Sequence, residues 1–331
     1  MIRVAVLGAG RIGRIHAANA AANPRARLVA VADPVAAAVR SLADRLGCAA
    51  TTDSEELLAR DDIDAVVIGT PSDTHAGLLV RAARAGKAVL CEKPLDNNLA
   101  AADALIEVLA GLGAPVMMAF NRRFDPSNVA LKAAIDAGEI GDVRQVIITS
   151  RDPRLPPREY VAHSGGIFRD MVIHDFDMAR FLLGEEPVEV YAQASRLVDP
   201  ALLAEFDDYD TATVLLRTGA GRQCVITCCR EAVYGYDQRL EVLGSTGMLL
   251  NDNLRPSTIR RYTATETEAR PPLLDFFVER YADAYRNELD AFLVALDDGR
   301  PMPTGPHDGR QALRLADAAI ESVVTARAVK V

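Results

Sequence analysis

The feature that most constrains this fold is a glycine-rich turn, GAGRIG at residues 8–13, directly after an apolar N-terminal run. Residues 2–7 are apolar apart from one arginine, as expected for a central parallel strand. An alanine-rich stretch from about Arg14 to Ala22 predicts a helix, which an Asn-Pro pair ends. A second apolar run, 26–32, predicts a strand that ends at Asp33. Strand, glycine turn, helix and strand in this order predict a βαβ unit that binds a dinucleotide.

The glycines of the turn have separate tasks in such a unit. Gly8 permits the tight turn, Gly10 lets a pyrophosphate approach the backbone, and Gly13 lets the helix pack closely on the strand. The phosphates would rest on the free N–H groups at the start of the helix. A GxGxxG pattern alone is weak evidence, and an ordinary βαβ turn is the alternative. We expect the cofactor to bind at Gly8, Gly10, Arg11, Ile12 and Gly13.

Asp33 indicates which dinucleotide is bound. It lies twenty residues beyond Gly13, at the tip of the second predicted strand. There a carboxylate accepts hydrogen bonds from both hydroxyls of the adenosine ribose and repels a 2′-phosphate. The sequence therefore predicts NAD rather than NADP.

The alternation of strands and helices continues along the first part of the chain. Strands are predicted at 64–69, 87–91 and 115–120, and helices at 76–85 and 99–112. In a doubly wound sheet, ligands bind beyond the carboxyl ends of the strands, where polar loops follow these runs. We expect Thr70, Pro71, His75, Glu92, Lys93 and Arg123 to meet the cofactor there.

Two of these residues have an equally plain alternative. His75 starts a predicted helix, where a histidine often faces solvent. Lys93 precedes a proline, which favours an extended backbone, permits a cis bond and so fixes the direction of the lysine. An ordinary surface lysine is the alternative.

The pattern changes after residue 142. Strands are predicted at 143–150, 187–194, 210–216, 223–229 and 238–243, and helices within 164–184, 276–296 and 310–329. We expect an α/β protein. Its Rossmann domain, a doubly wound parallel sheet at 1–122, would bind the dinucleotide. An α+β domain at 123–331 with an open, mostly antiparallel sheet would bind substrate and form oligomers. The helix within 276–296 and the last helix would cover remaining faces or return to the first domain.

Asp170 and His174 lie four residues apart in the predicted helix at 164–184. On a helix they point from one face, one turn apart. A carboxylate beside an imidazole orients and tunes a proton acceptor near neutral pH. The chain has only five histidines, so this spacing is informative. A surface His–Asp pair is the alternative.

Composition excludes several classes of function. The chain has 331 residues, enough for two domains. Its formal net charge is −9 and it has no run of five or more basic residues, which argues against nucleic acid as a partner. The five cysteines form no Cys-x-x-Cys pair or zinc-type cluster, so we expect no metal and a reducing cytoplasm. No apolar run approaches the ~20 residues that span a bilayer, so no membrane association is expected.

Taken together, these features resemble the oxidoreductase family named after glucose–fructose oxidoreductase, inositol dehydrogenase and rhizopine catabolism. The resemblance runs nearly end to end. It rests on the glycine motif, Glu92-Lys93-Pro94, the FNRRF run at 120–124 and the segment around Asp170 and His174. The inositol 2-dehydrogenases are the most similar subgroup, through residues 150–153, 165–180 and 232–239.

The resemblance implies that Lys93, Asp170 and His174 form the catalytic group. Oxidising a secondary alcohol requires removal of the hydroxyl proton while hydride leaves the same carbon. With no zinc site expected, an organic base must take that proton. We expect His174 to be the base and Asp170 to orient it. Lys93 would stabilise the developing alkoxide.

An inositol ring carries six hydroxyls, so its pocket needs many polar groups. Asn121, Arg151 and Tyr234 are polar residues in the loops that we expect to surround this pocket. A tyrosine at a strand edge often only packs against its neighbours, which is the alternative for Tyr234 and Tyr236. Asp177 falls on the same helical face as Asp170 and His174 and could join the substrate site. A helix cap or a salt bridge is an equal alternative for its carboxylate. Lys93, Arg123, Asp152, Asp170, His174 and Tyr236 are the predicted substrate ligands.

The expected activity is NAD-dependent, metal-independent oxidation of a ring hydroxyl of myo- or scyllo-inositol to an inosose. A pyranose dehydrogenase of the same family is the alternative within the class, because glucose-like rings present a similar belt of hydroxyls. A regulatory NAD-binding protein without chemistry is the alternative from another class. The resemblance, and an open sheet that needs a partner, also imply a homo-oligomer, expected to be a tetramer.

Overall fold

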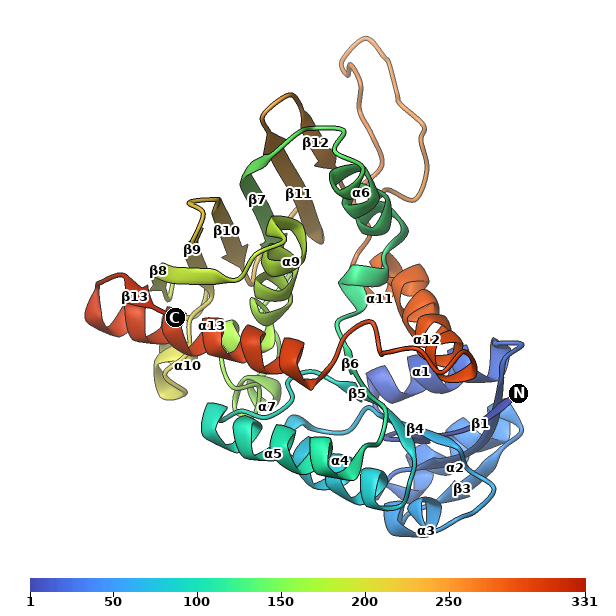
Figure 1. Cartoon of the computed structure of the whole chain (residues 1–331). Helices are drawn as coiled ribbons and strands as arrows, with labels where there is room; N and C mark the ends of the chain where they lie inside the picture. The colour runs from blue at the N-terminus through green and yellow to red at the C-terminus, as the bar shows by residue number, and fades with distance from the viewer. The chain divides into compact units, whose positions relative to one another are not determined.

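The computed structural model describes all 331 residues, which divide into two compact units (Figure 1). The first unit contains residues 1–124 and 283–313, and the second contains 125–282 and 314–331. The boundary was expected after residue 122, with the two C-terminal helices covering remaining faces or returning to the first domain. In the structure the first unit ends at residue 124 and is discontinuous, because residues 283–313 also belong to it.

The first unit is built on a six-stranded parallel sheet, as expected. The strands are β1 (Ile2–Leu7), β2 (Ala26–Ala32), β3 (Ala49–Thr51), β4 (Ala65–Ile68), β5 (Ala88–Glu92) and β6 (Val116–Ala119). Their order is β3-β2-β1-β4-β5-β6, and every neighbouring pair is parallel. The chain reverses its direction of winding between β1 and β4, the position at which such sheets bind ligands.

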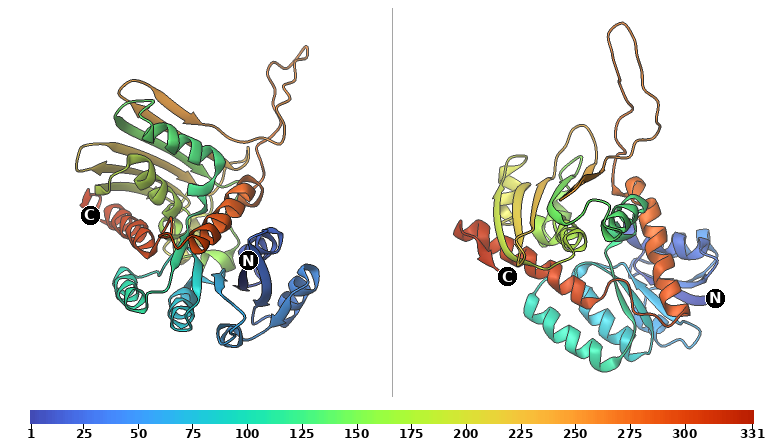
Figure 2. Two further views of the ribbon diagram at one scale, coloured as in Figure 1. Left: turned by 45° about the vertical axis from the view of Figure 1, so that its right-hand side comes forward. Right: turned by 45° about the horizontal axis from the view of Figure 1, so that its top comes forward.

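Helices lie between and beside these strands (Figure 2). They are α1 (Arg11–Ala22), α2 (Ala36–Leu46), α3 (Ser54–Leu58), α4 (His75–Arg84) and α5 (Leu99–Leu112), with short 3-10 turns at Ser72–Thr74 and Asn121–Phe124. All but the first residue of α12 (Ala282–Asp297) also belongs to this unit. Leu289, Phe292 and Leu293 recur at helical spacing on α12 and pack in the core with Val4 and Val6 of β1. The returning segment therefore completes the core of the first unit.

The second unit contains a mixed, mostly antiparallel sheet of seven strands, which confirms the expected fold class. The strands are β7 (Val143–Arg151), β8 (Pro187–Ser195), β9 (Thr211–Thr218), β10 (Gln223–Cys229), β11 (Asp237–Gly244), β12 (Met248–Asn251) and β13 (Val329–Lys330), in the order β12-β11-β7-β10-β9-β8-β13. Only β7 and β10 run parallel to each other. The helices are α6 (Pro126–Asp136), α7 (Arg158–Val161), α8 (Ile167–Asp170), α9 (Ile173–Leu183), α10 (Pro200–Glu205) and α11 (Phe277–Arg280). Helix α13 (Pro306–Thr325) crosses from the first unit to the second after Leu313.

The two faces of this second sheet differ. Helix α9 packs against β7 and β10, where Cys224, Ile226 and Cys228 are buried and the Cys228 thiol contacts Asp175 of α9. Along the other face, a cross-strand row joins neighbouring strands in register. It consists of Tyr191 of β8, Leu215 of β9, Val225 of β10 and Ile147 of β7. Leu215 is 47% exposed, so this row, which we call the outer row, is left partly uncovered.

The predicted helix at 164–184 is two helices in the structure. Met171 and Val172 lie between α8 and α9, and both are buried. The backbone adjusts here, and the N–H of Val172 bonds to the carbonyl of Ile167. Asp170 therefore ends α8, and His174 belongs to the first turn of α9.

Three other expectations also need correction. The predicted helix at 276–296 is divided at Tyr281 into α11 and α12. The predicted helix at 310–329 ends at Thr325, because Ala326 adopts a left-handed φ of +53°, and Val329 pairs with β8 as part of β13. No element was predicted between residues 36 and 63, where the structure has α2, β3 and α3.

Candidate functional site

Close backbone packing around the glycine turn explains why it needs glycine. Gly8 has a φ of +107°, and a Cβ there would lie 2.5 Å from the carbonyl oxygen of Gly69. A Cβ on Gly13 would lie 2.0 Å from the carbonyl oxygen of Gly8. Gly69, which follows β4, was not singled out from the sequence. A Cβ on it would approach the backbone nitrogen of Gly13 to 3.2 Å, so three glycines share one contact between β1, α1 and β4.

Gly10 differs from the other two glycines of the motif. A Cβ on Gly10 would meet no atom within 4 Å, so there is open space beside the start of α1. No side chain caps this helix, and its first turn has no acidic residue. The free N–H groups of the first turn, where Arg11 and Ile12 lie, therefore suit an anionic group such as a pyrophosphate.

Asp33 ties the tip of β2 to the glycine turn. Its Oδ2 accepts a hydrogen bond of 2.6 Å from the N–H of Ala9, and its Oδ1 accepts one of 2.8 Å from the N–H of Val35. A carboxylate has about four lone-pair positions. Each oxygen thus retains acceptor capacity, and the backbone bonds hold the group in one orientation. This arrangement fits the ribose-binding role predicted for Asp33.

His75 connects the loops that follow β4 and β5. Its side chain is buried, which excludes the alternative of a solvent-facing histidine. The ring nitrogen Nδ1 lies 2.8 Å from the carbonyl oxygen of Pro94, and Nε2 lies 3.0 Å from that of Thr70. Both ring nitrogens are therefore engaged by the backbone of the two loops. Pro71, which follows Thr70, is exposed.

A buried polar cluster lies beside Glu92, the residue before Lys93. Oε1 of Glu92 is 2.8 Å from Nε2 of His16 in α1, and the His16 ring meets the Tyr285 ring edge-on at 5.6 Å. Glu288, one turn along α12 from Tyr285, is fully buried. Burial and the nearby Glu92 carboxylate raise the pKa of Glu288 well above its usual range. The sequence did not signal this cluster, because its members lie up to 272 positions apart.

Arg123 lies in the turn after β6, as expected. Its guanidinium pairs with the carboxylate of Asp308 at 3.0 Å. Asp308 also accepts a bond from the N–H of Gly305, near the start of α13. The side chain of Arg123 is 13% exposed, so a fixed partner limits its direction.

In the second unit, Asp170 is held by two side chains. The Tyr160 hydroxyl donates a 2.8 Å bond to Oδ1 of Asp170, and Nη2 of Arg230 lies 3.5 Å from Oδ2. Arg230 is buried, and its Nη1 lies 3.4 Å from Asp208, whose Oδ1 accepts a bond from the N–H of Ile167. Asp208 and Asp170 stand at the two ends of α8. Arg230 therefore connects both ends of the short helix that carries Asp170.

Tyr160 is the main residue of this region that sequence reasoning missed. Desolvation and the negative charge of Asp170 raise the pKa of its phenol. It therefore remains a hydrogen-bond donor to Asp170 at neutral and alkaline pH. His174, in the first turn of α9, is partly exposed, as a proton acceptor for a dissolved substrate has to be.

The structure places the other predicted substrate residues in different surroundings. Tyr236 is 5% exposed and packs edge-on against Phe276 and Tyr281, which favours the packing alternative. Asp177 is buried and pairs with Arg180 at 3.4 Å, the salt-bridge alternative.

Asp152 and Tyr234 lie at the ends of the strands of the second sheet. Asp152 is partly exposed just after β7, where its backbone bonds to Cys229 and Ala232. The Tyr234 hydroxyl bridges Arg151 and Asp237, with bonds of 2.7 and 2.8 Å. Asp152 is therefore partly exposed at a strand end, whereas the hydroxyl of the exposed Tyr234 is engaged by Arg151 and Asp237.

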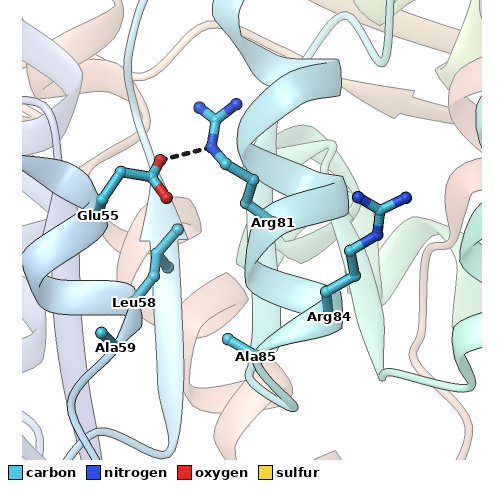
Figure 3. Close-up of a pocket in the computed structure, with 6 residues that line it drawn as sticks. All are labelled: Glu55, Leu58, Ala59, Arg81, Arg84 and Ala85. Carbon is cyan, nitrogen blue, oxygen red and sulfur yellow. Dashed lines mark ion pairs between the residues drawn. The ribbon is translucent and has the colours of Figure 1, made fainter.

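A shallow depression of about 300 Å³ lies between α3 and α4 (Figure 3). Glu55 and Arg81 form an ion pair across it, with 2.5 Å between the nearest nitrogen and oxygen. Arg84, which also lines it, is nine residues from His75, roughly 13 Å along α4. The depression is therefore separate from the strand-end loops that carry the candidate site.

Two other kinds of feature are absent from the structure. No group of three or more His, Cys, Asp and Glu side chains is arranged to hold a metal ion. No helix combines the length and the apolar character that crossing a bilayer requires.

Comparison with known proteins covers the full length of the chain. Residues 2–120 match the model of an oxidoreductase family with an NAD-binding Rossmann fold, and residues 128–250 match that of the GFO/IDH/MocA C-terminal domain. The inositol 2-dehydrogenase of Rhizobium meliloti (strain 1021) is 50% identical over 330 residues, which span 100% of this chain and 99% of the relative.

Two solved structures are similar over their whole length. A myo-inositol dehydrogenase from Corynebacterium glutamicum has a TM-score of 0.96 at 46% identity, covering 100% of this chain and 99% of that one. The scyllo-inositol dehydrogenase of Lactobacillus casei with bound NAD(H) and scyllo-inositol has a TM-score of 0.92 at 30% identity, with the same coverage.

Proposed function

This chain belongs to the GFO/IDH/MocA family of NAD-binding oxidoreductases, and from that premise we propose that it oxidises a ring hydroxyl of an inositol to an inosose. The observation that carries the proposal is the full-length likeness to proteins named as inositol dehydrogenases, at 50% and 46% identity. One of the similar structures holds both NAD(H) and scyllo-inositol. The substrate is therefore expected to be myo- or scyllo-inositol.

The residues around the glycine turn fit NAD. Gly10 leaves open space at the uncapped start of α1, and Asp33 is oriented by the N–H groups of Ala9 and Val35. The fixed carboxylate would accept bonds from the ribose hydroxyls and repel a 2′-phosphate. When bound, NAD accepts the hydride that leaves the ring carbon.

We assign the proton chemistry to three side chains. His174 takes the proton of the reacting hydroxyl as its oxygen forms the carbonyl double bond. Asp170, itself held by Tyr160 and Arg230, orients the imidazole and stabilises the charge that it gains. The ammonium of Lys93 donates a hydrogen bond to the reacting oxygen and stabilises the developing alkoxide. We also keep Arg123, Asp152 and Tyr236 as proposed contacts of the substrate site.

The first experiment is a substrate panel. Formation of the reduced cofactor is followed with myo-inositol, scyllo-inositol, D-glucose and further polyols, with NAD and NADP in parallel. The proposal expects turnover of at least one inositol and a preference for NAD. Activity on sugars alone would select a pyranose dehydrogenase. Tight binding of NAD without turnover on any polyol would indicate a regulatory protein.

The second experiment tests the catalytic group. His174→Ala and Lys93→Ala should each lower kcat by about 10²–10⁴-fold, the usual contribution of a positioned acid or base. His163→Ala, at an exposed histidine of the same unit, is the matched control and should keep wild-type turnover. Wild-type kcat in either of the first two variants would contradict the assignment.

We further propose that the protein is a homo-oligomer, expected to be a tetramer, assembled through the uncovered face of the second sheet. The outer row of Tyr191, Leu215, Val225 and Ile147 supports this, because it leaves apolar side chains on an open sheet face.

A further inference from the structure

A buried arginine of the second unit, Arg230, lies between two carboxylates. Its Nη1 is 3.4 Å from Oδ2 of Asp208, and its Nη2 is 3.5 Å from Oδ2 of Asp170. Arg230 is 1% exposed and Asp208 is 3% exposed, so little water screens their charges. We call Asp208, Arg230 and Asp170 the charge triad.

Arg230 is shared between the two carboxylates rather than committed to one of them. In the buried pair of Asp125 and Arg280, the nearest nitrogen and oxygen are 2.5 Å apart, whereas both contacts of Arg230 are 3.4 Å or longer. The Nη1 of Arg230 faces Asp208 without a hydrogen bond of good geometry. A guanidinium is a rigid planar fork, so moving closer to one carboxylate draws it from the other. The two carboxylates therefore compete for one cation.

Asp208 is the fixed end of the charge triad. Its Oδ1 accepts hydrogen bonds of 2.7 Å from the N–H groups of Ile167 and Tyr209. Turning the Asp208 carboxylate toward Arg230 would break these bonds. Asp170 ends α8, and its side chain is 16% exposed, so it is the carboxylate that can turn. The pull of Arg230 on Asp170 is therefore limited by how well Asp208 balances the guanidinium.

The charges of the triad matter for a proton acceptor beside it. Two carboxylates and one guanidinium leave a net charge of −1. A neutral residue in place of Asp208 would leave Arg230 and Asp170 to cancel each other. A negative charge next to an imidazole stabilises the imidazolium that forms when the ring takes a proton. Asp208 therefore leaves the charge of Asp170 available to such a ring.

We propose that Asp208 is the counter-ion that keeps Arg230 from neutralising Asp170, which makes Asp208 a positioning residue for His174. This rests on the proposed function, because it presumes that His174 takes the proton with Asp170 as its partner. Asp208 is buried, and it acts through the guanidinium of Arg230 and through α8, whose first N–H it binds.

The test compares wild type with Asp208→Asn, Arg230→Gln and the variant that carries both substitutions. Asparagine keeps an oxygen for the N–H groups of Ile167 and Tyr209, so Asp208→Asn changes mainly the charge. We expect each single variant to lower kcat on the best inositol about tenfold, with little change in the KM for NAD. The double variant restores the net charge of the triad and should keep kcat within about threefold of wild type.

A purely structural role gives a different result. Two independent losses would multiply, so the double variant would lose about a hundredfold in kcat. A double variant that is no more active than Asp208→Asn, or wild-type kcat in Asp208→Asn, would overturn the proposal. Asp207→Asn is the matched control, because the Asp207 side chain is 94% exposed and pairs with Arg196 at the surface. It should keep wild-type kcat.

A further variant decides the matter if Asp208→Asn does not fold. Arg230→Lys keeps a cation between the two carboxylates, whereas Arg230→Gln removes it. The proposal then expects kcat of Arg230→Lys to exceed that of Arg230→Gln at least threefold. Equal kcat values in these two variants would overturn it.

Unfolding measurements separate this proposal from the proposed function. Arg230→Gln leaves Asp208 buried without its cation, so the double variant should be the more stable of the two in urea. That comparison needs no substrate, and it decides whether Asp208 balances Arg230 even if the wild type turns over no polyol, which would contradict the proposed function. Normal wild-type turnover with multiplying losses of kcat would overturn the role of Asp208 and leave the proposed activity intact.

Discussion

Asp170 is held by residues that lie ten and sixty positions away in the chain, Tyr160 and Arg230. The short helix α8 gives it no continuous helical support on its C-terminal side, so these contacts set the direction of its carboxylate. Asp170 and His174 were expected one turn apart on a single helix. Since the helix is interrupted between them, the orientation of the proposed base depends on tertiary contacts rather than on helical spacing alone.

Replacing Tyr160 by Phe removes the hydroxyl that bonds to Asp170. We expect kcat for inositol oxidation to fall about tenfold, since a hydrogen bond to a charged group is worth roughly 1.5 kcal/mol at the low end. The raised pKa of Tyr160 keeps the phenol protonated, so the effect should persist into alkaline pH. Steady-state kinetics across pH measures both expectations. Tyr262→Phe, at an exposed tyrosine, is the control, and equal kcat in the two variants would refute a role for Tyr160.

Glu288 should make stability depend on pH. Burial, reinforced by Glu92, raises its pKa in the folded state, so the native protein holds a proton that the unfolded chain releases above a pH of about 4.5. The free energy of unfolding therefore falls as pH rises from there toward the raised pKa, by at most about 1.4 kcal/mol per pH unit. Glu288→Gln removes this dependence.

Urea unfolding at pH values of about 5 and about 8 measures the difference. The variant should gain stability relative to wild type as pH rises. Glu107→Gln, at an exposed position on α5, should follow the wild type. A constant difference between Glu288→Gln and wild type at both pH values would show that Glu288 ionises normally.

Residue roles that depend on local geometry were predictable, whereas those that depend on distant contacts were not. Gly8 and Gly13 follow from the turn itself, and the structure confirms that a Cβ has no room at either. The position of Asp33 at the tip of β2 likewise followed from the local sequence pattern. His16 and Arg230 carried no sequence signal, because each acts through a side chain at least sixty positions away.

At the scale of elements, a buried ion pair connects α6 to α11. Oδ2 of Asp125 pairs with Nη1 of Arg280 at 2.5 Å, and both side chains are 2% exposed. Oδ1 of Asp125 also caps α6 by accepting bonds from the N–H groups of Ser127 and Asn128. The Asp125 carboxylate therefore caps the start of α6 and neutralises the Arg280 guanidinium at the end of α11.

Asp125→Ala should be strongly destabilising. It leaves the Arg280 guanidinium buried without its partner, which costs about 3–5 kcal/mol, and it removes the cap, which costs about 1 kcal/mol more. The free energy of unfolding, or the corresponding drop in Tm, measures the loss. Asp275→Ala breaks the exposed pair with Arg154 and should cost less than about 1 kcal/mol. Similar losses of unfolding free energy in both variants would show that the buried Asp125–Arg280 pair contributes no more to stability than an exposed pair.

Elements with strong internal patterns matched their predicted bounds. Strands β1, β2 and β10 and helix α5 have the predicted limits, because continuous or alternating apolar runs and clear end signals define them. The short edge strand β3 has three residues, none of them buried, so no apolar pattern marks it. The division at Tyr281 and the left-handed Ala326 result from packing and backbone geometry that propensity does not encode.

At the scale of the whole molecule, the second sheet carries the face through which we propose that the protein assembles. Its outer row leaves apolar side chains partly uncovered, and the register continues from Ile147 to Glu241 of β11. In the oligomer that we propose, a second copy of the chain covers this face.

Leu215→Glu is the corresponding test of assembly. A buried glutamate at the centre of a symmetric interface is costly, so we expect the variant to shift to smaller species than the wild type in size-exclusion chromatography with light scattering. Arg144→Glu, at an exposed position of β7, is the control. A monomeric wild type, or a Leu215→Glu variant with unchanged mass, would refute this interface.

The discontinuous first unit has a consequence for how the protein is made. Its core includes Leu289, Phe292 and Leu293, which the ribosome adds after six of the seven strands of the second sheet, β7 to β12. At typical rates of about 5–20 residues per second, the nucleotide-binding segment waits on the order of 10 s for the helix that seals it. During that interval an apolar surface on the nascent chain stays open. Nascent chains arrested near residue 124 should therefore be digested by protease and bound by chaperones, and chains that extend past residue 313 should resist digestion.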